Sequence, residues 1–97
     1  MGFIDLDFEE IRNGHFQATE QFGQYQLSVV LLPGAIRYEA AIFDDDLFVQ
    51  LPGIHPNYND DWCDDVIVGL MPEDVTGIMI KLKTLEGPPK VVDKTIH

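Results

Sequence analysis

Alternation of apolar and polar residues is the strongest pattern in the chain. Within residues 25–31, Tyr25, Leu27, Val29 and Leu31 fall on one side of an extended segment, and Gln26 and Ser28 fall on the other. A second run of this kind covers residues 36–42, after the chain-breaking pair Pro33-Gly34. A period of two residues is typical of strands with one buried face, so we expect a strand in each run.

The aspartates after the second run predict a tight turn. Asp44, Asp45 and Asp46 separate that run from a short apolar stretch at 47–51, and aspartate favours turns because its side chain bonds nearby backbone groups. Three strands with such short connections predict an antiparallel meander. Upstream, residues 7–14 begin with acids and end at a glycine, which predicts a short helix.

The second half of the chain leaves alternatives open. Residues 51–60 contain two prolines, one glycine and two asparagines, which predicts a surface loop. Residues 60–71 fit either a helix or an acidic lead-in to a strand, and the β-branched residues at 66–68 favour the strand. For the following segment we expect one helical turn at 72–75 and a strand at 78–85, although helical spacing also fits.

These elements predict one α+β domain over residues 1–97, with a mostly antiparallel sheet of four to five strands and one or two short helices. A chain of 97 residues that is 45% hydrophobic is large enough to bury a core of its own. The C-terminal segment 86–97 is short and contains two prolines, and we expect it to form a mobile tail.

The cysteine content and the N-terminal sequence indicate a compartment. Cys63 is the only cysteine, so no intramolecular disulfide can form, which is typical of the reducing cytosol. The chain starts with acids where a signal peptide carries basic residues, and no apolar run approaches the roughly 18 residues of a membrane span. We therefore expect a soluble cytoplasmic protein, located in the host cytosol if a phage encodes it.

Charge is the most unusual property of the sequence. The net charge is −11, from 17 acids and 6 bases, so at least eleven carboxylates have no one-to-one partner. Their mutual repulsion costs stability, so folding does not explain them. They are either inert solubilising charge or face something positive. Residues 38–80 contain no Lys or Arg and ten acids: Glu39, Asp44, Asp45, Asp46, Asp60, Asp61, Asp64, Asp65, Glu73 and Asp74.

No motif for metal binding or catalysis is present. Residues 59–70 lack the glycine and the closing glutamate of a calcium loop. His55, Asp60 and Cys63 do not have the spacing of a structural zinc site. Acids around Cys63 disfavour its thiolate, and Ser28 has no flanking elbow glycines. We therefore expect no metal, no cofactor and no enzymatic activity.

The charge distribution does suggest a binding function. Direct nucleic-acid binding needs Lys and Arg, and residues 38–80 have neither. The reversed polarity favours a protein that occupies a basic groove, so the expected partner is a basic nucleic-acid-binding protein or ribonucleoprotein complex. The ten acids above are the candidate contacts. In the stretch NDDWCDD, we expect Trp62 and Cys63 to anchor the segment in the core while the flanking aspartates face outward.

The chain resembles the small acidic phage-encoded inhibitors that mimic DNA, including anti-CRISPR and anti-restriction proteins. The resemblance lies in size, in net charge and in the stretches FDDD (43–46), NDDWCDD (59–65) and PED (72–74). It implies an inhibitor that blocks the DNA- or RNA-binding groove of a host defence complex.

A second interpretation is a non-enzymatic structural or assembly subunit of a phage particle or a larger complex. It rests on apolar segments at 47–54, 66–71 and 78–85, which would pair with a neighbouring chain if they were exposed at sheet edges. The sequence leaves the oligomeric state open.

Overall fold

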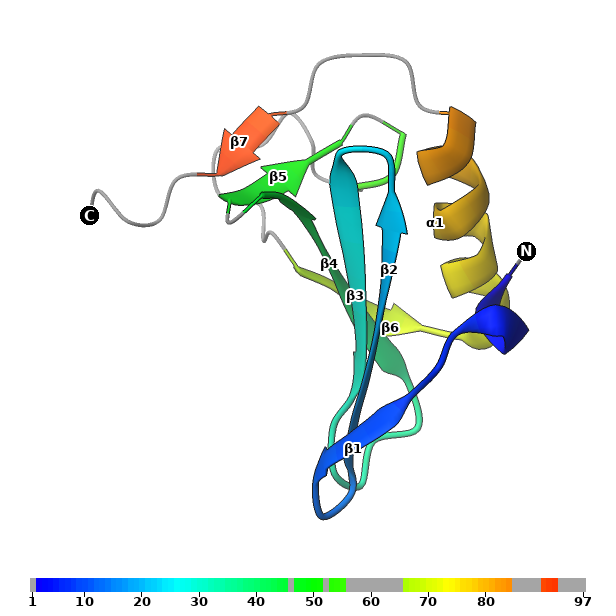
Figure 1. The fold of residues 1–97 in the computed structure, drawn as a ribbon. Helices are drawn as coiled ribbons and strands as arrows, with labels where there is room; N and C mark the ends of the chain where they lie inside the picture. Colours follow the sequence, from blue (N-terminus) through cyan, green and yellow to red (C-terminus); the bar gives the residue numbers. More distant parts are fainter. Residues whose placement is uncertain (1, 46, 52, 56–65, 85–89, 93–97) are drawn as a thin grey trace.

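The protein folds as an α+β domain in which one helix covers one face of a twisted antiparallel sheet (Figure 1). The predicted fold class is confirmed. The computed structural model describes residues 2–45, 47–51, 53–55, 66–84 and 90–92. The elements in chain order are η1 (Phe3–Asp5), β1 (Glu9–Arg12), β2 (His15–Phe22), β3 (Tyr25–Leu31), β4 (Tyr38–Asp44), β5 (Leu47–Gln50), β6 (Val66–Leu70), α1 (Pro72–Thr84) and β7 (Lys90–Val92).

Strand β4 organises the sheet. The strand order is β1-β2-β3-β4-β5-β7, and β6 also pairs with β4. The first half of β4 pairs with β6, through Tyr38↔Leu70 and Ala41↔Val66. Its last two residues pair with β5. Because β3 occupies the other edge of β4, β5 and β6 must follow one another along a single edge and cover opposite ends of the strand.

The predicted meander is confirmed as β3, β4 and β5, and the strand favoured at 66–71 is confirmed as β6. The second strand continues as far as Asp44, which pairs directly with Leu47. That register leaves a two-residue connection, in which Asp45 has a positive φ of 58°. Aspartate tolerates this left-handed conformation better than most residues, so the predicted turn is confirmed at Asp45. Asp46 lies outside the described residues.

The helix predicted at 7–14 is wrong. This segment contains β1, which pairs with β2 through a tight hairpin at Asn13-Gly14. Arg12 lies opposite His15, and Gly14 has a φ of +77°. Asn-Gly is a strong signal for such a two-residue hairpin. The same glycine was interpreted as a helix end because both motifs use a left-handed residue. Strand β2 was not predicted from the sequence.

The strand predicted at 78–85 is wrong, because residues 72–84 form one continuous helix, α1. Its buried side chains follow the helical period, whereas Ile80, which strand alternation would bury, is 55% exposed. The helix carries acids in its first turn and lysines in its last, an arrangement that its dipole favours. The buried residues are Val75, Ile78, Met79 and Leu82.

The described residues at 47–51 and 53–55 are less exposed than the sequence suggested. Val49 and Leu51 are fully buried, and Ile54 and His55 are also buried. The ring of His55 accepts a hydrogen bond at Nδ1 from the backbone N–H of Leu51, at 2.9 Å. The surface loop predicted at 51–60 is therefore wrong for these core residues, and residues 56–60 lie outside the described ranges.

The two faces of the sheet differ in composition. The inner face packs against α1, and its most buried residues include Leu27, Val29 and Ile42. The opposite face, called the outer face below, carries the alternate residues of the same strands, such as Gln26 on β3. Within the described ranges, no helix is both long and apolar enough to cross a membrane.

The two chain ends attach differently to this sheet. Phe3 and Phe8 form a cluster of aromatic rings with Tyr38 of β4, with centroid separations from 4.9 to 5.7 Å. These rings hold the N-terminal segment beside the helix and the sheet (Figure 1). Of the C-terminal residues 86–97, those at 90–92 form β7, which pairs with β5.

Candidate acidic binding site

The structure describes half of the candidate acids. These are Glu39, Asp44, Asp45, Glu73 and Asp74. The other candidate acids lie outside the described residues, as do the two proposed anchors; they are Asp46, Asp60, Asp61, Asp64 and Asp65, with Trp62 and Cys63.

The five described candidate acids do not form one cluster. Glu39 and Asp44 are five positions apart on β4, so their side chains point to opposite faces and their Cα atoms are about 17 Å apart. Asp45 follows in the β4–β5 turn. Glu73 and Asp74 belong to the first turn of α1. The described acids therefore occupy three places: the start of β4, the end of β4 with its turn, and the start of α1.

Several carboxylates stabilise the fold locally. Asp74 accepts a hydrogen bond at Oδ2 from the backbone N–H of Met71, at 2.8 Å, which satisfies a donor at the start of α1. Asp5 accepts from the N–H of Gly2 at 3.0 Å, and Glu10 accepts from the N–H of Gly14 at 3.2 Å. These three acids therefore have a role in the fold, and the other acids still outnumber the bases.

Two of the described cations bond to backbone oxygens. The guanidinium of Arg37 donates to the carbonyl of Gly69 at 3.3 Å. The ammonium of Lys81 donates to the carbonyl of Gly53 at 2.8 Å. These contacts tie β6 and the 53–55 segment, in which Ile54 and His55 are buried, to their neighbours. Two of the chain's six bases therefore donate hydrogen bonds to uncharged carbonyl groups.

Asp45 lines an open groove on the outer face, and Asp44, whose side chain starts on the inner face opposite Tyr25, borders one end of it. It consists of two adjoining hollows of about 360 and 310 Å³ that share Gln26 and Asp45 as lining residues. The side-chain amide of Gln24 donates to Asp44 Oδ2 at 3.0 Å, which fixes one carboxylate at the rim. We call this feature the outer groove; its lining residues are Gln17, Thr19, Gln21, Gln24, Gln26, Ser28, Phe43, Asp44 and Asp45.

Strand register explains why this groove is polar on one side and apolar on the other. Gln21 lies opposite Gln26, which lies opposite Phe43. Phe43 packs against Phe48 of β5, with ring centroids 4.4 Å apart. Amides from β2 and β3 therefore continue directly into aromatic rings from β4 and β5.

The next row of the outer face contributes hydroxyl groups. Thr19 lies opposite Ser28, and Ser28 Oγ accepts a hydrogen bond from the amide of Gln17 at 2.9 Å. The sequence placed Gln26 and Ser28 on the polar side of a strand, but it gave no reason to group them with Gln17 and Thr19. That grouping depends on β2, which the sequence analysis missed.

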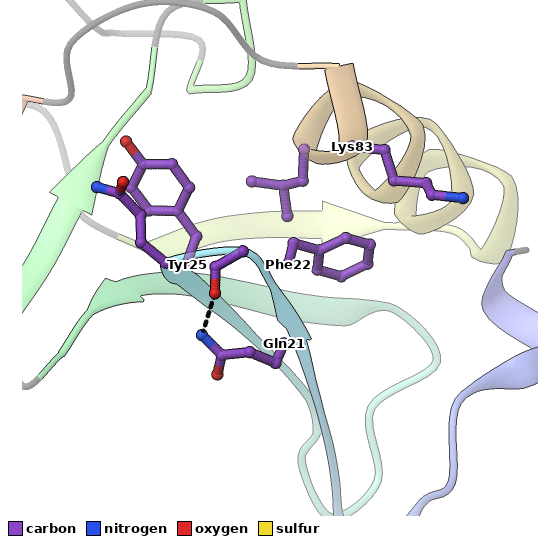
Figure 2. A pocket seen from close by; sticks show the side chains of 7 residues that line it. Gln21, Phe22, Tyr25 and Lys83 are labelled. Carbon is purple, nitrogen blue, oxygen red and sulfur yellow. Dashed lines mark hydrogen bonds between the residues drawn. The ribbon is translucent and has the colours of Figure 1, made fainter.

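Apart from the outer groove, a hollow of about 470 Å³ lies between the β2–β3 turn and the end of α1 (Figure 2). The titratable groups among its lining residues are Tyr25 and Lys83. Figure 2 shows the Lys83 side chain running along the helix, away from the Tyr25 hydroxyl, and the Gln21 amide bonded to the Gly23 carbonyl. The side chains of Tyr25 and Lys83 therefore do not converge on one point in this hollow.

The described residues offer little for metal binding. Among them, no group of three or more His, Cys, Asp or Glu side chains is placed to hold a metal ion. Of the zinc ligands considered from sequence, His55 is described; its Nδ1 already accepts the Leu51 N–H.

Comparisons with protein families, with curated proteins and with solved structures found no match to this chain. Its function is therefore inferred from its own residues.

Proposed function

We propose that the protein is a non-enzymatic acidic inhibitor that occupies the basic DNA- or RNA-binding groove of a partner protein or ribonucleoprotein. An anti-CRISPR-like role against a host defence complex, in the reducing cytosol of a phage-infected cell, fits this activity. The partner is bound through protein–protein contacts, and the acidic protein itself contacts no nucleic acid.

Uncompensated negative charge is the observation that carries this proposal. The chain has a net charge of −11, and two of its bases, Arg37 and Lys81, bond to backbone carbonyls. Asp45 and Glu73 are exposed. Carboxylates in this state attract cationic surfaces and speed association with them, and they repel the phosphates of nucleic acid.

The separation of the described acids refines the proposal. Three acidic places on different parts of the fold suit a partner that surrounds the protein, or one that is contacted mainly at one of them. The end of β4 is the strongest candidate for a main contact, because Asp44 and Asp45 adjoin the outer groove.

The proposal can be tested by capture followed by competition. The tagged protein is used to capture partners from the lysate of a candidate host at low and at high NaCl, with identification by mass spectrometry. We expect a basic nucleic-acid-binding protein that is retained at low salt and lost at high salt, since screening weakens contacts between exposed charges. In a gel-shift assay, the acidic protein should displace duplex DNA or RNA from that partner. A complex that holds nucleic acid and the acidic protein together would contradict the proposal.

Charge-neutral variants extend this test. Replacing Asp44, Asp45 and Asp46 with Asn should weaken displacement, and so should the same change at Asp60, Asp61, Asp64 and Asp65. A control that removes two charges from β1 and the segment before it, Asp7→Asn with Glu9→Gln, should weaken displacement much less for each charge removed. Effects in proportion to the charge removed in all three variants would indicate that net charge alone governs the interaction.

A structural or assembly subunit remains a second candidate function, supported by apolar exposure. Ile4, Ile36 and Val68 are 92%, 87% and 63% exposed, respectively. The apolar segments at 47–54 and 78–85 give this role less support than their sequence suggests, because much of 47–54 is buried and residues 78–84 lie in α1. Apolar assembly predicts association that persists at high salt. Capture at two salt concentrations therefore separates the two functions.

A further inference from the structure

We propose that the outer groove binds an arginine side chain of the partner, with the guanidinium seated between the carboxylate of Asp45 and the ring of Phe43. This inference rests on the proposed function and identifies both a contact point and the chemistry of the group it accepts. It concerns the groove across the outer face and not the acids at the start of α1.

The lining of the groove selects a cation. Its described residues supply carboxylates, amides, hydroxyls and one aromatic ring, and none of them is Lys or Arg. Asp44 and Asp45 lie together at one end. A phosphate or another anion would meet these carboxylates at close range without a compensating cation, so electrostatics disfavour it.

The geometry favours arginine over lysine. A guanidinium is planar, donates in a fixed fork that matches a carboxylate, and stacks on aromatic faces. Phe43 lines the same hollow as Asp45, so one group can contact both. Gln26 borders both hollows, and its amide oxygen offers a further acceptor. A lysine ammonium would use the carboxylate but gain less from the flat ring.

The groove is held in shape before any partner arrives. The Gln24 amide fixes Asp44 at 3.0 Å, and Phe48 supports Phe43 at a centroid separation of 4.4 Å. Gln17, Thr19, Gln21, Gln26 and Ser28 come from the paired strands β2 and β3, and Asp45 comes from the β4–β5 turn. Side chains that are already ordered lose little conformational entropy on binding, which raises the affinity available from a small contact.

Nuclear magnetic resonance with a defined probe tests this inference. Hexa-arginine and hexa-lysine peptides are titrated into the ¹⁵N-labelled full-length protein at physiological salt. We expect hexa-arginine to shift the backbone signals of Phe43 and Asp45 and the side-chain amide of Gln26 most strongly. Hexa-lysine should bind several-fold more weakly.

Matched variants give the test its specificity. Asp45→Asn should weaken hexa-arginine binding about tenfold, the effect of losing one charge-assisted hydrogen-bonded pair, whereas Asp7→Asn should have little effect. Gln26→Lys, at an exposed position, should also abolish the shifts in the groove. Ile80→Lys adds the same charge on the exposed side of α1 and should leave the shifts intact.

The outcomes separate this inference from the proposed function. If hexa-arginine binds but the largest shifts fall outside the groove, or if Asp45→Asn and Asp7→Asn act equally, the arginine site is refuted while the proposed function stands. Equal binding of hexa-lysine refutes the selection of arginine. If neither peptide binds on any face, the proposed function fails and this inference fails with it.

Discussion

Tyr25 is the residue that links the hydrophobic core to the acidic end of β4. Its ring is buried and lines the hollow beneath the end of α1, together with Phe22 (Figure 2). Its cross-strand partner is Asp44. Burial of the side chain raises the pKa of Tyr25 above its usual value, and the negative charge of Asp44 raises it further.

This shift predicts a loss of stability in alkaline solution. The unfolded chain ionises Tyr25 near its ordinary pKa of about 10, before the native state does, so the native state holds more protons above that pH. The free energy of unfolding should therefore fall as the pH rises from about 10 through the native pKa, and the contribution should be complete below about 10.

Urea midpoints near pH 9 and near pH 11 provide the measurement. The midpoint of Tyr25→Phe should decline less than that of the wild type, because phenylalanine does not ionise. Asp44→Asn should reduce the decline in part, since it removes the second cause alone. Identical declines in all three proteins would show that Tyr25 makes no contribution.

Helix α1 shows how local signals can conflict within one element. Val75 and Met79 match the helical period, whereas the β-branched residues and Gly77 disfavour a helix. Contacts at the start of the helix and at its interface with η1 favour the helical conformation. Asp74 satisfies the Met71 N–H, and Thr76 Oγ1 accepts the N–H of Phe3 at 2.9 Å, which docks η1 onto the helix.

Gly77 therefore offers a way to stabilise the element. A Cβ at this position would meet no atom within 4 Å, so Gly77→Ala should raise the free energy of unfolding by about 0.5–1 kcal/mol through the lower entropy of the unfolded chain. Urea denaturation with a constant m-value would measure this.

Gly2→Ala is the matched control. There a Cβ would lie 3.1 Å from Cγ2 and Oγ1 of Thr76, so the same change should give no gain or a loss. A destabilised Gly77→Ala protein would indicate that the helix surface near residue 77 is covered.

At the scale of the whole molecule, net charge opposes folding. A net charge of −11 on 97 residues creates self-repulsion in the compact state. Local bonds such as those of Asp5 and Asp74 offset part of it. The exposed acids remain as a cost, which the proposed function explains by a cationic partner.

This repulsion should respond to salt. Near neutral pH, the urea midpoint should rise between about 20 mM and about 500 mM NaCl, because the Debye length shortens over this range. Replacing Asp44, Asp45 and Asp46 with Asn should flatten the salt dependence. A midpoint that does not change with salt would show that the charges are too far apart to repel.

The sequence by itself determined the features that depend on neighbouring residues. Alternation identified β3 and β4, the aspartates identified the turn at Asp45, and the charge count identified the surplus of acid. The first two signals lie within a few residues, because the side-chain period of a strand and the preferences of a turn are local properties. The surplus of acid is a property of composition and needs no structure.

The tertiary structure alone decided the rest. Residues 78–84 satisfy both periods, and burial against the sheet selected the helix. Asn13-Gly14 fits a helix end or a hairpin, and pairing with β2 selected the hairpin. The outer groove brings Gln26 beside Asp45, which are nineteen positions apart in the sequence. Cross-strand register, which no local pattern encodes, creates this site.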